Sequence, residues 1–195
     1  MKYLPHNKLD FIKSRIPEEH FKLLTEDEID GLYQYLVDSE NEVQYSDSKD
    51  YQFMRLAREI ASWSKDPSSK LGAVAISENN FIVLAQGYNG FPRGIEDDHR
   101  LYIRALKYPI IVHAEMNLIY NAARNGTSLE NSTVYVYGLP CCSDCVRGII
   151  QSKVKRIVMC DIKKDPRWIE SFQLTAALLD EAQIKYDFIE QEFLD

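Results

Sequence analysis

Apolar and polar residues alternate with two different periods along most of this chain. Over residues 48–64 the apolar positions fall at helical spacing, so one face of a helix would carry Phe53, Met54, Ala57, Ile60 and Ala61. Two short apolar runs follow, at 71–77 and 81–87, separated by the turn-forming pair Asn79-Asn80. This pattern predicts a helix followed by a β-hairpin.

The rest of the pattern alternates between helices and strands. After a loop at 88–112, the predicted helices cover 113–125, 142–151 and 167–182, and the predicted strands cover 133–137, 156–160 and 185–189. Helices that connect strands at this spacing are typical of an α/β protein with a layered sheet.

The first 47 residues differ from the rest because they are acidic and polar. Thr25, with Glu28 three residues later, has the pattern of a helix start with a capping box. We expect a helix over 26–37, followed by a linker, because 38–49 is rich in Ser, Asp, Glu and Asn. The sequence therefore predicts a helical arm with its linker (1–47), to which it assigns no function, and a larger domain (48–195).

Composition and charge narrow the class of protein. The 195 residues are 45% hydrophobic and 27% charged, which fits a globular protein with one core. The net charge of −7 argues against a nucleic-acid-binding surface, which is usually basic. No apolar run reaches the roughly 18 residues of a membrane span, and the first residues lack a signal-peptide pattern. Three of the four cysteines are clustered, which favours metal binding in a reducing compartment over disulfides.

A metal-ligand pattern accounts for the clustered cysteines. His113 is followed by Glu115, and Cys142 and Cys145 come after the next predicted strand. Catalytic zinc takes three protein ligands and keeps a fourth position for water; His113, Cys142 and Cys145 provide three. Residues two apart on a helix do not share a face. We therefore expect Glu115 not to bind the metal but to carry protons to and from the bound water.

Two alternatives concern the cysteines. The second thiolate comes from either Cys142 or Cys141, and Cys142 is preferred because only residues i and i+3 place both sulfurs on one helix face with Cys145. A CxxC pair also occurs in redox sites and in closed structural zinc sites, where Cys141 would be the fourth ligand beside His113. Adjacent cysteines point apart, which disfavours the four-ligand site.

Several motifs together resemble the deoxycytidylate (dCMP) deaminase family of the cytidine deaminase superfamily. The matching segments are FMRLARE (53–59), SKDPSSKLGA (64–73), GYNGFPRG (87–94), KYP (107–109), HAEMN (113–117) and CSDC (142–145). HAE followed by PCxxC is the pattern of the superfamily, and GYNG with HAExN points to the dCMP branch. In one departure from the family, Cys141 stands between Pro140 and Cys142.

The resemblance implies a three-layer α/β/α fold of the cytidine deaminase type, with a central mixed sheet of about five strands. It implies hydrolysis of dCMP to dUMP and ammonia, in which hydroxide formed at Zn²⁺ attacks C4 of cytosine and Glu115 moves the protons. The alternatives are another cytosine nucleotide or nucleoside as substrate, or an inactive zinc-binding assembly protein, against which Glu115 argues.

The resemblance also concerns partners and location. It implies a small pyrimidine nucleotide as the partner, without nucleic acid or membrane, and a homo-oligomer for which a hexamer is favoured. It makes dCTP and dTTP candidate regulators, although no residue establishes regulation. We expect a cytoplasmic location, in the host cytoplasm if the protein is viral.

Substrate contacts follow less directly from the sequence. Superfamily members place an Asn of the GYNG loop against a sugar hydroxyl, which points to Asn89, and Gly87 is expected to let this loop turn close to a ligand. A phosphate prefers Arg or Lys. Lys70 and Arg93 are the candidates for the 5′-phosphate, in competition with Arg104, Lys107 and Arg124.

Overall fold

The computed structural model of this chain describes residues 8–42, 49–161 and 166–190. The chain divides into two compact units, Met1–Ser48 and Lys49–Asp195, and each is described by itself. None of the described helices is long and apolar enough to cross a membrane.

The first unit holds helices around a small apolar core. They are α1 (Lys8–Lys13), α2 (Glu18–Phe21) and α3 (Glu26–Glu42), and the buried Phe11 and Ile12 pack against side chains of α3. The predicted capping box is present, because the N–H and the hydroxyl of Thr25 both donate to Glu28 Oε2 at 2.8 Å. Helix α3 continues to Glu42, beyond its predicted end at 37, since no Gly or Pro interrupts it there.

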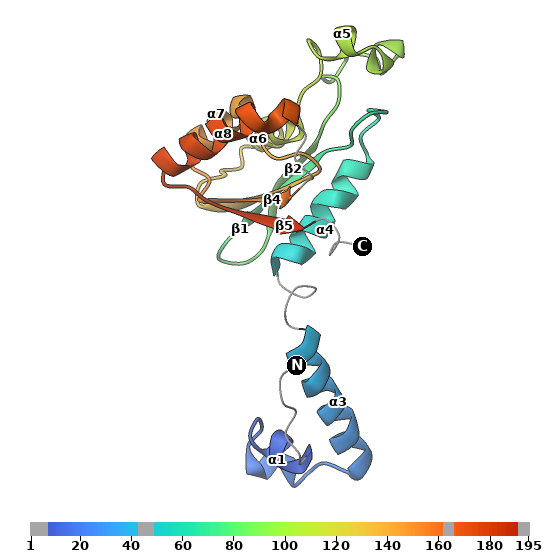
Figure 1. Ribbon diagram of the computed structural model, residues 1–195, viewed down its shortest axis with the longest axis vertical. Helices are drawn as coiled ribbons and strands as arrows, with labels where there is room; N and C mark the ends of the chain where they lie inside the picture. The colour runs from blue at the N-terminus through green and yellow to red at the C-terminus, as the bar shows by residue number, and fades with distance from the viewer. Residues whose placement is uncertain (1–7, 43–48, 162–165, 191–195) are drawn as a thin grey trace. The chain divides into compact units, whose positions relative to one another are not determined.

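A mixed five-stranded sheet forms the centre of the second unit (Figure 1). Its strands lie in the order β2-β1-β3-β4-β5. Strand β1 pairs antiparallel with β2 and β3, whereas β3, β4 and β5 are parallel to one another. The strands are β1 (Gly72–Ser77), β2 (Val83–Tyr88), β3 (Ser132–Tyr137), β4 (Arg156–Asp161) and β5 (Lys185–Glu190).

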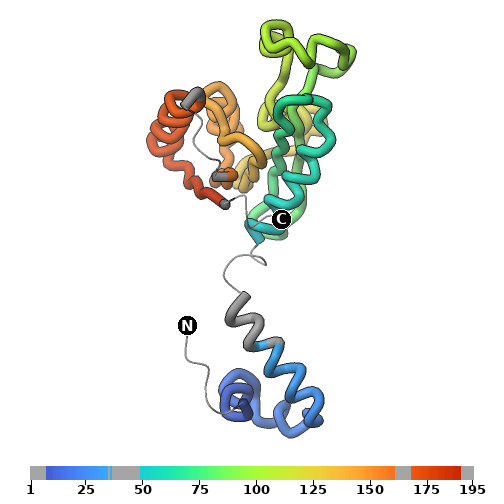
Figure 2. Tube along the Cα trace, turned by 45° about the vertical axis from the view of Figure 1, so that its right-hand side comes forward, coloured from blue at the N-terminus to red at the C-terminus, as the bar shows by residue number. Residues whose placement is uncertain are grey.

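Helices cover both faces of this sheet. Successive strand residues point to opposite faces: Val74 and Tyr135 pack against α4 (Lys49–Ser62), and Ala73 and Val134 pack on the side of α6, α7 and α8. Figure 2 shows α4 and the pair α7 and α8 on opposite sides of the strands. These helices are α6 (Ala114–Asn125), α7 (Ser143–Gln151) and α8 (Pro166–Glu181). The expected α/β/α fold with a mixed sheet of five strands is confirmed.

Two further differences from the sequence prediction lie in the second unit. Strand β2 starts at Val83 and not at 81, because Phe81 has a left-handed backbone (φ 56°) and belongs to the turn. The predicted loop at 88–112 contains the helical turns η1 (His99–Tyr102) and α5 (Arg104–Lys107). This segment extends away from the sheet at the top of Figure 2.

Gly87 lets α6 lie directly against β2. A Cβ at this position would stand 2.3 Å from the backbone nitrogen of Leu118 and 2.4 Å from the carbonyl oxygen of Ala114, so only glycine fits. The prediction that Gly87 serves a turn is wrong, because this residue lies within β2. Its absent side chain sets the distance between the sheet and the first turns of α6.

Candidate metal centre and active site

Both halves of the metal-ligand pattern lie where a helix begins. His113 is the N-cap of α6 and Cys142 is the N-cap of α7, and both have an extended backbone (ψ 159° and 164°). The hydrophobic pattern predicts instead that each residue lies within its helix, as the first residue. Cys142 and Cys145 therefore converge as the N-cap and the third residue of one helix, a pair whose side chains meet across the first turn, and not as two residues on a helix face.

Two amide side chains hold α6 on the sheet. Asn117 Nδ2 donates to the carbonyl oxygen of Tyr88 at 2.8 Å, and Asn121 Nδ2 donates to that of Gln86 at 2.7 Å. Together with the close approach at Gly87, these bonds fix the first turn of α6 relative to β2, and with it His113.

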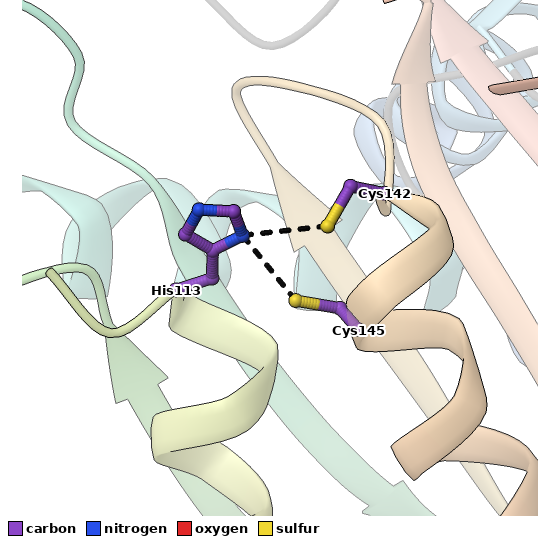
Figure 3. Close-up of side chains that lie close together, drawn as sticks. All are labelled: His113, Cys142 and Cys145. Carbon is purple, nitrogen blue, oxygen red and sulfur yellow. Dashed lines mark hydrogen bonds between the residues drawn. The ribbon is translucent and has the colours of Figure 1, made fainter. Parts of the chain in front are cut away.

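His113, Cys142 and Cys145 point toward one another from the starts of the two helices (Figure 3). His113 Nδ1 lies 3.4 Å from Cys142 Sγ and 3.4 Å from Cys145 Sγ. All three ligand atoms lie within 4.8 Å of one another. One nitrogen and two sulfurs at this spacing fit around a single Zn²⁺ ion that keeps its fourth tetrahedral position for water.

Electrostatics within the cluster favour a thiolate on Cys142. The hydrogen bond from the Cys145 thiol, and after it the contact with the His113 ring, lower the pKa of Cys142 to about 4 in spite of its burial. The contact with Cys142 raises the pKa of His113, and it also raises the pKa of Cys145, to which burial adds. A metal ion binds the thiolate form of cysteine, so its binding here releases thiol protons.

Glu115 is buried beside this cluster. The residue is 3% exposed, and burial raises the pKa of its carboxyl group, which also hydrogen-bonds the Cys141 thiol. The cluster of three ligand atoms does not include it. A buried acid close to the metal position but separate from the ligands is suited to proton transfer.

Cys141 differs from its neighbour in its surroundings. It is fully buried, its Sγ donates to the carbonyl oxygen of Cys142 at 3.6 Å, and burial raises the pKa of its thiol well above the usual value. Zinc binds the thiolate form. The geometry and the buried thiol therefore both favour Cys142 over Cys141 as the ligand, and they disfavour a closed four-ligand site.

A pocket of about 610 Å³ opens beside His113. This volume is within the range for small-molecule sites, so the pocket can hold a small ligand next to His113. The wall combines the loop before β1 with the segment that carries α5, and its residues are Asp66, Ser68, Ser69, Leu71, Asn89, Tyr102, Arg104, Lys107, Tyr108, Ile111, His113, Leu139 and Trp168.

Asn89 lines this pocket, but its side chain also supports the wall. Asn89 Oδ1 accepts from the Leu71 N–H at 2.8 Å, and Nδ2 donates to Ser69 O at 2.8 Å and to Asp66 Oδ2 at 3.4 Å. The remaining acceptor position on Oδ1 is therefore what Asn89 can offer a sugar hydroxyl.

The structure places Lys70 and Arg93 outside this pocket. Lys70 Nζ donates to the carbonyl oxygen of Ser62 at 3.0 Å. Arg93 donates to Asn121 Oδ1 at 2.7 Å and lines a separate hollow with Arg124. The competing cations Arg104 and Lys107 do line the pocket beside His113.

The buried partner of Lys107, Asp66, was not identified from the sequence. The two form an ion pair of 2.8 Å with side chains only 6% and 3% exposed. One indication of this pair was present in the sequence, because both residues lie inside motifs of the family resemblance, SKDPSSKLGA and KYP.

A family model for the cytidine and deoxycytidylate deaminase zinc-binding region matches residues 47–161. The chain belongs to this family. The match includes both helix starts that carry the cluster of His113, Cys142 and Cys145. Zinc is therefore the cofactor of this deaminase-family chain.

Sequence relatives agree with this membership, and a solved structure has the same fold. The chain is 35% identical to a probable deoxycytidylate deaminase of Caenorhabditis elegans over 145 residues, which are 72% of this chain and 70% of that protein. It is 37% identical to human deoxycytidylate deaminase over 133 residues, which are 65% and 70% of the two proteins. A dCMP deaminase of the cyanophage S-TIM5, solved with dCMP and dUMP, has the same fold, with a TM-score of 0.58 and 22% identity over 71% of this chain and 94% of that one.

Proposed function

We propose that this enzyme hydrolyses dCMP to dUMP and ammonia. The observation that carries the proposal is the group of His113, Cys142 and Cys145, whose ligand atoms lie within 4.8 Å of one another. His113 lines a pocket, and the buried Glu115 lies beside the group. The deoxycytidylate deaminases among its relatives support dCMP as the substrate.

Each of the four residues has one task in this proposal. His113 Nδ1 and the sulfurs of Cys142 and Cys145 hold the zinc ion. Zinc, when bound, supplies a Lewis acid that lets water lose a proton near neutral pH. Glu115 accepts that proton and passes it to N3 of the cytosine ring while the water oxygen bonds to C4. Glu115 then takes the second proton of that oxygen and passes it to the amino nitrogen, the C4–N bond breaks, and ammonia leaves as C4 becomes a carbonyl carbon.

The pocket wall orients the nucleotide. Asn89 accepts a hydrogen bond from a sugar hydroxyl through the second acceptor position of Oδ1, while its bonds to Leu71 and Ser69 keep the amide in place. Because Lys70 and Arg93 lie outside the pocket, they leave the 5′-phosphate to other residues.

The broader context of the enzyme belongs to the same proposal. Deamination is carried out by residues 48–195, and 1–47 is a separate helical arm. The family resemblance supports a homo-oligomer, with a hexamer favoured, regulation by dCTP and dTTP, and a cytoplasmic location. The acidic net charge of −7 supports a small-molecule partner over nucleic acid.

A substrate panel tests the proposal. The full-length protein is assayed for bound zinc and for ammonia release from deoxycytidine, dCMP, dCDP, dCTP and the corresponding ribonucleotides. We expect about one zinc per chain and the highest kcat/KM with dCMP. Preference for a nucleoside or a triphosphate would keep the chemistry and refute the substrate. Bound zinc without ammonia release from any compound would indicate the inactive zinc-binding protein.

A further inference from the structure

The pocket beside His113 has its positive charge on one short helix. Among the described lysines and arginines, Arg104 and Lys107 line this pocket, and both belong to α5. A nucleoside monophosphate carries a dianionic group, which prefers Arg and Lys as partners. The location of these two cations in the proposed active site makes α5 the element to consider for phosphate binding.

Lys107 is a buried cation in a fixed position. Its Nζ donates to Asp66 Oδ1 at 2.8 Å and to Ser68 Oγ at 3.2 Å, and its side chain is 6% exposed. A lysine ammonium group has three N–H donors, so one remains for a ligand in the pocket. The two protein bonds hold the ammonium group in one place, so a ligand does not have to order a flexible side chain.

Asp66 would repel a phosphate if its charge faced the ligand uncompensated. Its Oδ1 accepts from the backbone N–H groups of Ser68 (2.8 Å) and Ser69 (3.3 Å) in addition to Lys107, and its Oδ2 accepts from Asn89 Nδ2 at 3.4 Å. The carboxylate is therefore bonded on both oxygens by the pocket wall. Its negative charge serves to hold Lys107 and the loop.

Arg104 supplies the second cation in a different way. It is exposed, its Nε donates to the Tyr108 hydroxyl at 2.6 Å, and its guanidinium lies 4.9 Å from the centre of the Tyr108 ring. Within the described part of the chain its two terminal nitrogens have no hydrogen-bond partner, so they are available to two phosphate oxygens at once.

We propose that Lys107 and Arg104 bind the 5′-phosphate of the substrate, Lys107 from a position fixed by Asp66 and Ser68 and Arg104 as an exposed bidentate partner. This inference rests on the proposed deamination of dCMP and assigns its phosphate contacts to α5. The two residues thereby determine the preference for a nucleotide over a nucleoside.

Substitution of each cation, with matched controls, tests the proposal. Arg104→Gln and Lys107→Met are compared with Lys70→Gln and Arg93→Gln, which remove the same charge outside the pocket. For each variant kcat/KM is measured with dCMP and with deoxycytidine. In Arg104→Gln we expect the dCMP value to fall by about 10-fold or more and the deoxycytidine value to stay within about 3-fold. In Lys107→Met the dCMP value should fall by about 100-fold, at least about 10-fold more than the deoxycytidine value. The controls should change the ratio by less than about 3-fold.

A binding measurement separates this inference from the proposed chemistry. Titration of dUMP and of deoxyuridine by calorimetry requires no turnover, and Arg104→Gln should weaken dUMP alone. This result holds even if the protein deaminates neither substrate, in which case only the proposed function fails. Lys107→Met leaves Asp66 without its ion-pair partner, so the folding of this variant is checked by thermal unfolding. If Lys107→Met is unfolded, Arg104→Gln alone tests the inference. Equal losses for both substrates, unchanged dUMP binding, or an effect confined to Lys70 or Arg93 would overturn the inference.

Discussion

Replacing Glu115 by Gln tests the proposed proton transfer most directly. The amide has nearly the same shape as the carboxyl group, so the substitution leaves no cavity at a residue that is 3% exposed. Because Glu115 lies outside the cluster of ligand atoms, the variant should fold and should still bind about one zinc per chain. Only the ability to accept and return a proton is removed.

The size of the effect follows from the burial of Glu115. Bulk water cannot easily replace an acid at a buried position, so the full contribution of general acid–base catalysis should be lost, which is roughly 10²–10⁴-fold in rate. This range corresponds to about 2.7–5.4 kcal/mol of transition-state stabilisation. The loss should appear in kcat with dCMP, while dUMP binding stays nearly unchanged.

The matched control for Glu115 is Asp144→Asn. Asp144 carries the same charge next to the cysteine pair and affects the His113 ring, but it is exposed and pairs with Arg147. We expect its kcat to stay within about 3-fold of the wild-type value. The assay is ammonia release from dCMP together with metal analysis of each purified variant. Near-native turnover of Glu115→Gln would refute the proton-transfer role, and loss of zinc would show that Glu115 is a ligand.

Three further predictions concern the ligands, the packing and the pH dependence. Metal analysis should find that Cys142→Ser loses both zinc and activity while Cys141→Ser keeps about one zinc per chain; the reverse would make Cys141 the ligand. Gly87→Ala should lower the free energy of unfolding by about 3 kcal/mol or more in urea titrations, because the added Cβ would lie 2.3 Å from backbone atoms. The control Gly90→Ala should change this free energy by less than about 0.5 kcal/mol, because the atom nearest to its Cβ lies 3.9 Å away. Burial opposes ionisation of Asp50, but hydrogen bonds from Arg156 and Tyr135 outweigh burial and lower the pKa of Asp50. The free energy of unfolding should therefore fall as the pH drops below about 4, and it should fall less in Asp50→Asn.

The sequence predicted the order and type of the main elements because these depend on local periodicity. A helical repeat at 53–61 and short apolar runs such as 71–77 are visible within one segment. The position of β1 between β2 and β3 and the helices that cover each face depend on contacts between distant segments. The left-handed backbone of Phe81, which delays β2, has no sequence signal, since a large apolar residue rarely adopts it.

In the candidate site, too, the sequence predicted residues that a local pattern identifies but not residues that are identified by contacts with distant segments. Few residue types bind zinc, so the spacing of His113, Cys142 and Cys145 was informative by itself. A cation that contacts phosphate cannot be told from a surface charge by residue type, so the sequence left Lys70 and Arg93 in competition with Arg104, Lys107 and Arg124. Lys107 could be selected only once the structure showed that it is buried against Asp66, 41 positions away along the chain.

The segment between β2 and α6 allows substrate specificity to change independently of the proposed metal site. The proposed metal ligands sit at helix starts packed on the sheet, where a change such as a Cβ at Gly87 moves backbone. Tyr102, Arg104 and Tyr108 lie on a projecting segment and are largely exposed, so they can vary without loss of core packing. Evolution or laboratory selection can therefore alter which nucleotide is accepted by exchanging these three residues, while the buried Leu101 and Lys107 of the same segment and the hydrolytic machinery stay unchanged. A variant that carries these three residues from a relative with another substrate should acquire the donor's preference.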